Sequence, residues 1–149
     1  MKHELIDWLT RSPVNVFATV SLKQGIQRDD GCWASLTNEH ITKTAWLLRD
    51  RVTKAVVGKK AKIPFLVFVE GDGVVKRKHL HIATFKPMGI EFYDFSDTFR
   101  FKAMGLDWVY NEIDIRPIEA DTERRVIAYS LKEGMGAFIP EASFVPLMK

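Results

Sequence analysis

Cysteine is nearly absent from this sequence, since Cys32 is the single one among 149 residues. One cysteine excludes an internal disulfide and disfavours a cysteine-based zinc site. Such sparse use is typical of a reducing compartment, so we expect a cytoplasmic protein, or one inside the host cell if its source is viral. Residues 1–10 carry Lys2, Glu4 and Asp7 and contain no uninterrupted apolar run. We therefore expect neither a signal peptide nor a contact with the membrane.

The chain also lacks internal repeats, low-complexity tracts and any Pro/Gly/Ser linker long enough to separate two domains. We therefore treat residues 1–149 as one domain, a length that can bury a core without disulfides. No Gly-rich loop followed by Lys and Ser or Thr is present, which excludes a P-loop nucleotide-binding unit. Hydrophobic residues make up 46% and charged residues 28% of the chain, as in soluble globular proteins. The net charge of +3 mildly favours a polyanionic partner.

The first half of the sequence predicts three strands and a helix. Residues Val14 to Leu22 are rich in β-branched and aromatic types and predict a first strand. Residues Asn38 to Val57 have apolar side chains at helical spacing, with Asn38 as a cap and Gly58 as a stop. Ile63 to Val69 and His79 to Phe85 predict two further strands, which should pair as a hairpin.

The second half adds one ambiguous segment, one strand and one helix. Gly89 to Met104 is aromatic-rich and fits either a helix with an irregular start or a loop. Trp108 to Ile115 alternates as a strand, and Asp121 is the expected N-cap of a helix over Thr122 to Glu133 that stops at Gly134. The order of elements predicts an α+β fold, a central antiparallel sheet with helices packed on it in a ferredoxin-like arrangement.

His79 and His81 stand two residues apart in a predicted strand, so both imidazoles project from the same face of the sheet. Imidazole nitrogens suit manganese, cobalt, nickel and zinc, and a carboxylate as third ligand would leave positions open for substrate oxygens. Glu70, at the end of the partner strand, is the candidate for that ligand. Two histidines on a strand are also common as ordinary polar residues, so the spacing alone is a weak indication.

The third ligand depends on the shape of the connection between the two strands. Glu70 comes near the imidazoles only if residues 71–78 form a wide loop. A tight turn centred on Asp72 and Gly73 would pair Glu70 with Val75 instead. Asp72 would then be the alternative ligand, and the sequence leaves both arrangements open.

Tyr129 and Lys132 are three residues apart in the last predicted helix and should share one of its faces. A nearby ammonium favours the phenolate form of tyrosine, and Lys132 could also hold a phosphate group. A tyrosine in such a position more often packs a helix against a sheet, so this spacing also decides little by itself. A metal clamp on a sheet and a tyrosine on a following helix are nevertheless complementary parts of a phosphoryl-transfer site.

In that combination the chain resembles the HUH endonuclease superfamily, the rolling-circle replication initiators and their relatives. The hallmarks of that superfamily are a His-hydrophobic-His strand and a later helix with Tyr-x-x-Lys. The corresponding residues here are His79-Leu80-His81 and Tyr129-Ser130-Leu131-Lys132. Val16 to Ser21 corresponds to the less specific first motif strand. A single motif tyrosine is similar to initiators of the plasmid and small-virus type. The resemblance implies a nicking domain, either stand-alone or part of a longer protein.

The resemblance implies a metal-dependent, sequence-specific single-stranded DNA endonuclease that initiates rolling-circle replication of a plasmid or virus. His79, His81 and Glu70 would hold Mn²⁺ or Mg²⁺, and Tyr129 would attack the phosphorus to leave a 5′-phosphotyrosine, with Lys132 beside it. The implied partners are single-stranded DNA or an origin hairpin, and a host helicase. Backbone contacts are expected from two basic clusters, which comprise Arg124, Arg125, Lys76, Arg77 and Lys78.

Two other classes of function fit parts of the pattern. A nucleic-acid-binding module without catalysis would use aromatic residues of the sheet, Phe65, Phe68 and Phe85, as a stacking platform. A phosphodiesterase would use His79 and His81 directly as acid and base. Such enzymes usually contain a second histidine motif, whereas the other two histidines, His3 and His40, lie in unrelated contexts.

Overall fold

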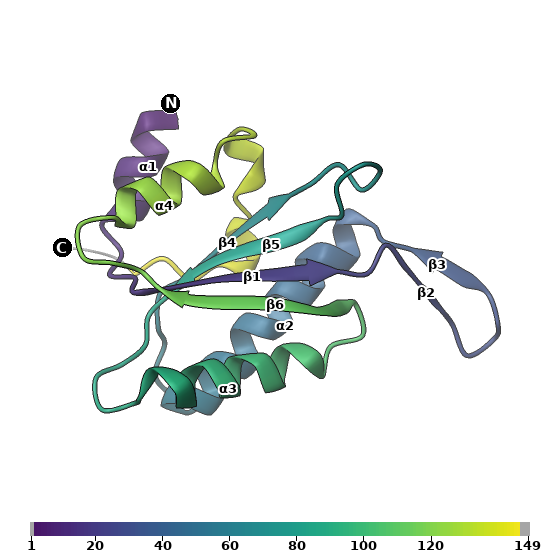
Figure 1. Ribbon diagram of the computed structural model, residues 1–149, viewed down its shortest axis with the longest axis horizontal. Helices are drawn as coiled ribbons and strands as arrows, with labels where there is room; N and C mark the ends of the chain where they lie inside the picture. Colours follow the sequence, from purple (N-terminus) through teal and green to yellow (C-terminus); the bar gives the residue numbers. More distant parts are fainter. Residues whose placement is uncertain (1, 147–149) are drawn as a thin grey trace.

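The computed structural model describes residues 2–146 and confirms the predicted α+β class (Figure 1). Four α-helices and six strands occur in this part of the chain, with two short 3₁₀ turns near its end. In chain order the elements are α1 (Lys2–Thr10), β1 (Val16–Leu22), β2 (Gly25–Gln27), β3 (Trp33–Ser35), α2 (Asn38–Val57), β4 (Phe65–Glu70), β5 (His79–Thr84), α3 (Phe92–Met104), β6 (Val109–Pro117), α4 (Glu123–Ser130), η1 (Met135–Ala137) and η2 (Pro140–Ala142).

The main sheet has the strand order β4-β5-β1-β6, and each neighbouring pair is antiparallel. Its central strand β1 corresponds to the first predicted strand, and burial alternates along it with period two. This alternation gives the sheet two chemically distinct faces, each of which needs its own cover.

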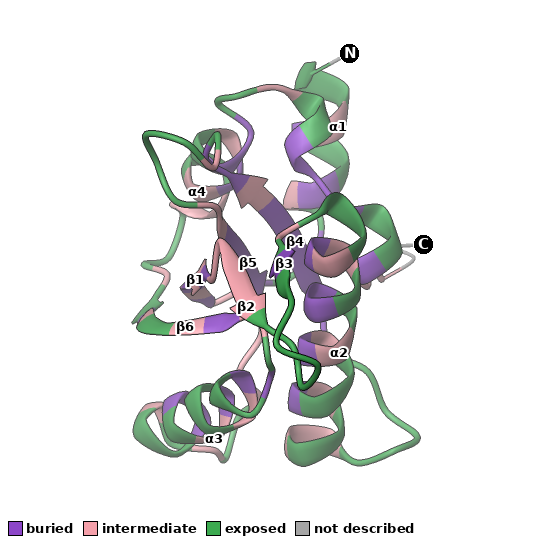
Figure 2. Ribbon diagram, turned by 90° about the vertical axis from the view of Figure 1, so that its right-hand side faces the viewer, coloured by how far each residue is buried: buried purple, intermediate pink, exposed green. Residues whose placement is uncertain are grey.

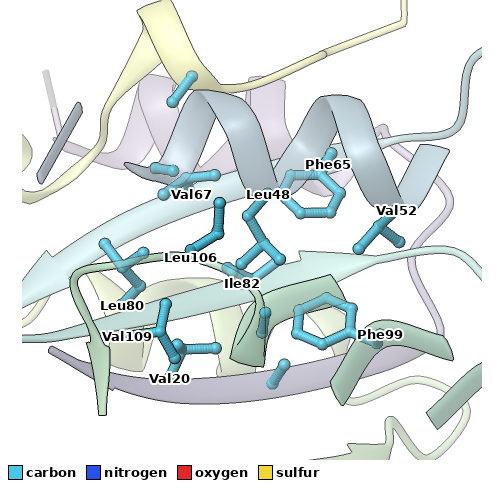
Figure 3. Packing of buried hydrophobic residues seen from close by; sticks show 14 of the residues in the cluster. Val20, Leu48, Val52, Phe65, Val67, Leu80, Ile82, Phe99, Leu106 and Val109 are labelled. Atoms are coloured by element: carbon cyan, nitrogen blue, oxygen red, sulfur yellow. The ribbon is translucent and has the colours of Figure 1, made fainter. Parts of the chain in front are cut away.

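One face of the sheet packs against α2 and α3 and forms the larger core (Figure 3). Val20, Leu80 and Ile82 point to this side from the sheet, and Leu48 of α2 and Phe99 of α3 meet them there. Helix α2 spans the predicted residues Asn38 to Val57 and ends at Gly58 as expected. Its N-cap is Thr37 rather than Asn38, because the Thr37 hydroxyl accepts a hydrogen bond from the His40 backbone N–H.

The opposite face is covered by α1, α4 and the first 3₁₀ turn, which form a second core. Leu66, Phe68 and Ala83 belong to the sheet side of this core, and Ile127 and Leu131 cover them. Figure 2 shows buried positions on the inner sides of α1 and α2, with exposed positions on their outer sides. The second core is the smaller of the two and does not cover its whole sheet face, so polar residues lie at one end of that face.

Strands β4 and β5 pair as the predicted hairpin, and their register decides the position of Glu70. Glu70 lies opposite His79, and Phe68 lies opposite His81. Residues 71–78 therefore form a wide loop, and the alternative tight turn that pairs Glu70 with Val75 is wrong. Gly71 has φ 103° in this loop, and a Cβ there would lie 2.5 Å from the Arg77 carbonyl oxygen. Only glycine fits so close to backbone.

The last helix is shorter than predicted. Asp121 is not its N-cap, because Asp121 adopts a left-handed backbone with φ 67° and the helix begins at Glu123. The helix ends at Ser130, and Lys132 and Glu133 lie in the turn that follows. Residues on this turn bind the end of β4, where the Glu133 carboxylate accepts a hydrogen bond from the Gly71 N–H at 3.4 Å. In the turn itself, the Lys132 and Gly134 N–H groups donate to the carbonyl oxygens of Tyr129 and Leu131.

The sequence patterns missed α1 and the small β2–β3 hairpin. Both elements are short, and β2 and β3 have three residues each, too few for a period to be read. The ambiguous segment after residue 89 becomes helix α3 from Phe92 onward. None of the helices in residues 2–146 has the length and apolar character needed to cross a bilayer.

The larger core makes Leu48 a sensitive position, since its side chain is fully buried between the sheet and α2. We expect Leu48→Ala to lower the free energy of unfolding by about 2–5 kcal/mol, because it removes apolar contacts and leaves a cavity. Urea denaturation would measure the change. Lys43→Ala, on the exposed side of the same helix, is the control and should change stability by less than about 0.5 kcal/mol. Equal losses for both variants would contradict this assignment of the core.

Candidate metal centre and tyrosine

The candidate site lies at the polar end of the sheet face that carries the second core. Side chains two residues apart in a strand lie on the same face of the sheet. Glu70 therefore shares a face with Leu66 and Phe68 of β4. His79 and His81 share the same face with Ala83 of β5. The three side chains therefore point to the same side as α4. Glu70 and His81 are buried, with 4% and 5% of their surface exposed, and His79 is half-buried.

The side chains of Glu70, His79 and His81 converge on a common point. The nearest ligand atoms of the three residues all lie within 4.8 Å of one another. One carboxylate oxygen, Glu70 Oε2, is 2.7 Å from His79 Nε2 and also contacts His81 Nε2. This buried group could hold a metal ion, as the two-residue spacing and the wide-loop arrangement together predict.

The orientation of both imidazoles is fixed by contacts on the far side of each ring. His79 Nδ1 lies 3.0 Å from the carbonyl oxygen of Arg77, and His81 Nδ1 lies 3.3 Å from Thr19 Oγ1. The His81 ring also stacks on Phe17, with 5.2 Å between ring centroids. Because a carbonyl only accepts hydrogen bonds, the Arg77 contact places a proton on His79 Nδ1, which leaves Nε2, the atom that faces Glu70, as the one that could bind a metal. Metal-binding histidines commonly have this second contact.

The sequence did not identify Thr19 and Phe17 as site residues. Both belong to the first motif strand and lie on its site-facing side, where Thr19 is the register partner of His81. The signal that could have found them is the alternation of β1, once its pairing with β5 is known. No local pattern gives that pairing.

Two ammonium groups bind the other oxygen of the same carboxylate. Lys76 Nζ lies 2.7 Å from Glu70 Oε1, and Lys132 Nζ forms an ion pair with the same atom. Lys76 comes from the loop after β4, and Lys132 comes from the turn after α4. Glu70 therefore joins two loops and two imidazoles, and the cluster has a net positive charge even with neutral histidines.

These contacts shift three pKa values. Burial by itself would raise the pKa of Glu70, but hydrogen bonds from Lys132, Lys76, His81 and His79 outweigh it and hold that pKa well below its usual range. Burial lowers the pKa of His81, and the nearby Glu70 carboxylate offsets part of this change. The Glu70 carboxylate, followed by the Tyr129 hydroxyl, raises the pKa of Lys132. The carboxylate and the ammonium are thus both charged at neutral pH.

Asp72, the alternative ligand, is not part of this cluster. Its Oδ1 accepts hydrogen bonds from the backbone N–H groups of Val74, Val75 and Lys76, at 2.8 to 3.0 Å. Asp72 therefore shapes the loop that carries Lys76 toward Glu70. This is a structural role, and it follows from the wide loop that brings Glu70 itself to the histidines.

Tyr129 of α4 lies beside the same cluster. The centroids of the Tyr129 and His81 rings are 6.0 Å apart, and Lys132 Nζ is 3.9 Å from the Tyr129 centroid. Tyr129 and Lys132 are thus close, as predicted, although Lys132 lies beyond the helix end instead of on its face. Tyr129 has 53% of its surface exposed, so its phenol is open to a substrate.

The predicted DNA-contacting residues have different surroundings. Lys76 binds Glu70, and the Arg77 guanidinium lies 4.3 Å from the Tyr110 ring centroid and donates to the Leu22 carbonyl oxygen at 3.2 Å. Arg124 forms an ion pair with Asp7 of α1. Arg125 is exposed and Lys78 is half-buried. Among these five residues, Lys76 touches the Glu70 cluster through its side chain, and Arg77 touches it through its backbone carbonyl oxygen.

The aromatic stacking platform of the non-catalytic alternative is not available on this sheet. Phe65 and Phe68 are fully buried, Phe65 in the larger core and Phe68 in the second. Both are also covered along the edge strand by the C-terminal segment, through bridges from Phe65 to Phe144 and from Phe68 to Phe138. Phe85 is half-buried at the end of β5. A base could not stack on the first two rings without unfolding this edge.

The donor set fits a divalent metal of the borderline type. Two imidazole nitrogens and one carboxylate oxygen on one side of an ion leave its other positions open, which is typical of catalytic rather than closed structural sites. Comparisons of the chain with protein-family models, with curated proteins and with solved structures give no match. The candidate site therefore rests on its own geometry and chemistry.

Because the pKa of Glu70 is lowered in the folded protein, the free energy of unfolding depends on pH. The folded value of this pKa lies below the ordinary 4.5, so the contribution of Glu70 to stability is complete above pH 4.5 and is lost as pH falls through the folded value. We expect wild type to be more stable than Glu70→Gln near neutral pH in EDTA, and the difference to narrow below pH 4.5. Urea denaturation across this range would measure it. Glu112→Gln, at an exposed carboxylate, is the control, and a difference that stays constant with pH would contradict the assignment.

The candidate site predicts that one divalent metal ion binds per chain, and isothermal titration calorimetry with Mn²⁺ as the probe would measure it. We expect His81→Ala to remove measurable binding, because it deletes a ligand. We expect Thr19→Val to weaken binding by about tenfold, because outer contacts of this kind orient the imidazole. His3→Ala, which changes an exposed histidine of α1, should bind as wild type does. If wild type and His81→Ala take up the same amount of metal, the site is not where we place it.

Proposed function

We propose that this protein is a metal-dependent endonuclease that nicks and rejoins single-stranded DNA through Tyr129. The observation that carries the proposal is the position of Lys132, which binds Glu70 of the candidate metal centre and lies 3.9 Å from the centroid of the Tyr129 ring. One residue thus joins the nucleophile to the ligand group. The resemblance to the HUH endonuclease superfamily in His79-Leu80-His81 and Tyr129-Ser130-Leu131-Lys132 supports the same assignment.

The charge of the site favours a phosphodiester as substrate. Lys76 and Lys132 bring two ammonium groups to a single carboxylate, so an anion is attracted to the cluster. Mn²⁺ or Mg²⁺ on the imidazoles and Glu70 would supply Lewis-acid polarisation of a phosphate oxygen. Binding of the metal would compete with the lysines for the carboxylate, and a displaced ammonium could then contact the substrate phosphate.

The reaction that fits these groups is a transesterification. The Tyr129 Oη atom attacks phosphorus, the new Oη–P bond forms and the P–O3′ bond breaks on the opposite side. The phenol proton passes to solvent, and the leaving 3′ oxygen takes up a proton to become a hydroxyl. The ammonium of Lys132, 3.9 Å from the centroid of the phenol ring, would stay close to the developing phosphotyrosine.

The same site can run the reaction backwards, because the tyrosyl phosphodiester keeps the energy of the broken bond. A 3′-hydroxyl then attacks the phosphotyrosine, and the strand is rejoined without ATP. This chemistry suits the start and end of rolling-circle replication of a plasmid or virus. A helicase of the host is the partner that would unwind the duplex.

A single strand or an extruded hairpin is the substrate that fits the position of Tyr129. The ring of Tyr129 lies between α4 and the end of the sheet, beside the buried His81. A flexible backbone can bring its phosphate to such a site, and its unpaired bases remain free for stacking contacts. Lys76, Lys78 and Arg125 are the basic residues near the strand ends and on α4 that would contact the backbone.

The nicking activity predicts a covalent protein–DNA adduct. Incubation with a pool of fluorescent single-stranded oligonucleotides, some with hairpins, should give an adduct on denaturing gels in Mn²⁺ and none in EDTA. We expect Tyr129→Phe to abolish the adduct, because it removes the attacking oxygen. Tyr93→Phe is the matched control, because Tyr93 is also an exposed helical tyrosine but lies on α3.

Three results would contradict the proposal. One is an adduct of equal yield in Tyr129→Phe, and another is an adduct that forms equally well in EDTA. A third is DNA binding without an adduct on any sequence, which would instead support a non-catalytic binding module. Mass spectrometry of the adduct would identify the modified residue directly.

A further inference from the structure

The β2–β3 hairpin extends from the end of the sheet at which the candidate site lies (Figure 1). Its root contacts the 71–78 loop, where the Gln24 side-chain amide donates to the Gly73 carbonyl oxygen at 3.0 Å. The Leu22 N–H also donates to the Lys78 carbonyl oxygen at 3.0 Å. The hairpin is therefore attached to the loop that carries Lys76 to Glu70.

Trp33 is the most unusual residue of this hairpin, because 68% of its surface is exposed. The strand pairing places Trp33 on the same face of the ribbon as Gly25. A Cβ at residue 25 would lie 2.6 Å from Trp33 Nε1, so the indole lies close against the Gly25 backbone. One side of the ring is thus held by the hairpin, while much of the ring remains open to solvent.

The two faces of the ribbon differ in charge and burial. Ala34 points to the other face and is buried, with 7% exposure. Ile26, on that same face, lines a hollow of about 650 Å³, whose charged lining residues are Lys23, Arg28, Asp29, Asp30 and Asp107. With three carboxylates against two basic side chains, that side has a small net negative charge, which disfavours an anionic strand there. The face of Trp33 is the one that a nucleic acid can approach.

The shape of the hairpin does not depend on the tryptophan. The Arg28 N–H donates to the Cys32 carbonyl oxygen at 2.7 Å, and the Cys32 N–H donates to Asp30 Oδ1 at 2.9 Å. These bonds close the tip, and the Leu36 N–H bonds the Gln24 carbonyl oxygen at 2.8 Å to close the root. A large exposed indole on a ribbon that is already closed is available for a binding role.

We infer that Trp33 is a stacking platform for an unpaired base of the strand that enters the site, and this inference rests on the proposed function. Lys76 and Lys78 lie in and beside the loop that the hairpin root contacts, so the backbone of the same strand would meet positive charge there. Every base has a π-face, so stacking adds affinity with little sequence preference. Trp33 would therefore hold a part of the strand beyond the 71–78 loop, without choosing its sequence.

Fluorescence anisotropy with a labelled single-stranded oligonucleotide tests this role. We would use the full chain with Tyr129→Phe in EDTA, so that binding is measured without cleavage. Adding Trp33→Leu should weaken binding by roughly tenfold, because leucine keeps an apolar cover over Gly25 but has no π-face. Trp33→Phe should keep most of the affinity. Trp46→Leu, at an exposed tryptophan of α2, should bind as the parent does.

Each outcome separates the inference from the proposed function. Parent-like affinity in Trp33→Leu overturns the stacking role but leaves nicking by Tyr129 intact. Failure of the parent to bind any oligonucleotide overturns both. Loss of self-association in Trp33→Leu by sedimentation, with unchanged DNA affinity, would identify Trp33 as a contact between two copies and overturn the inference. If Trp33→Leu fails to fold, three other variants, Trp33→Phe, Trp33→His and Trp33→Ala, test the same point. Equal DNA affinity of Trp33→Phe and Trp33→His with weaker binding by Trp33→Ala supports stacking. Equal DNA affinity of all three variants overturns it.

Discussion

The buried carboxylate of Glu70 is the interaction on which the arrangement of the site depends. Its Oε2 contacts both imidazoles, and its Oε1 contacts the ammonium groups of Lys76 and Lys132. Burial of an unpaired carboxylate costs free energy, and these four partners offset that cost, so Glu70 can be buried only where they surround it. In return, the one group holds together the end of β4, the start of β5, the 71–78 loop and the turn after α4. The same side chain is thus a candidate metal ligand and a structural anchor.

The two faces of the sheet explain why the site lies where it does. The face toward α2 and α3 is apolar along its whole length, and it supplies most of the core. The other face is apolar only where α1 and α4 cover it, and it changes to Glu70, His79 and His81 at the end of the same strands. The β4–β5 pairing positions the three candidate ligands, while the proposed nucleophile, Tyr129, comes from the helix that closes the second core. Ile127 and Leu131 of that segment are buried beside an exposed Tyr129.

The contacts of the two lysines depend on the charge of the site. In this arrangement both ammonium groups bind the carboxylate that a metal ion would also use. A cation at the imidazoles would therefore weaken the lysine contacts and make the ammonium groups available to a phosphate. Loop 71–78 is held in shape by Asp72 rather than by Lys76 alone, so Lys76 can change partner without loss of the loop. Metal and substrate binding would then be coupled through one carboxylate.

The sequence by itself determined the elements in which the apolar pattern repeats over many residues, and the residues with distinctive chemistry. Strand β1, helix α2 and the β4–β5 pair follow from alternation or helical spacing, and the α+β class follows from their order. The pairs His79 and His81, and Tyr129 and Lys132, could be singled out because few side chains share their chemistry. Tertiary structure alone decided that Glu70 rather than Asp72 joins the histidines, since this depends on a backbone register that both Gly71 and Asp72 shape. It also decided that the last helix ends before Lys132, that Thr19 and Phe17 orient His81, and that Phe65 and Phe68 are buried. These features depend on contacts between residues far apart in the chain, and no local pattern contains them.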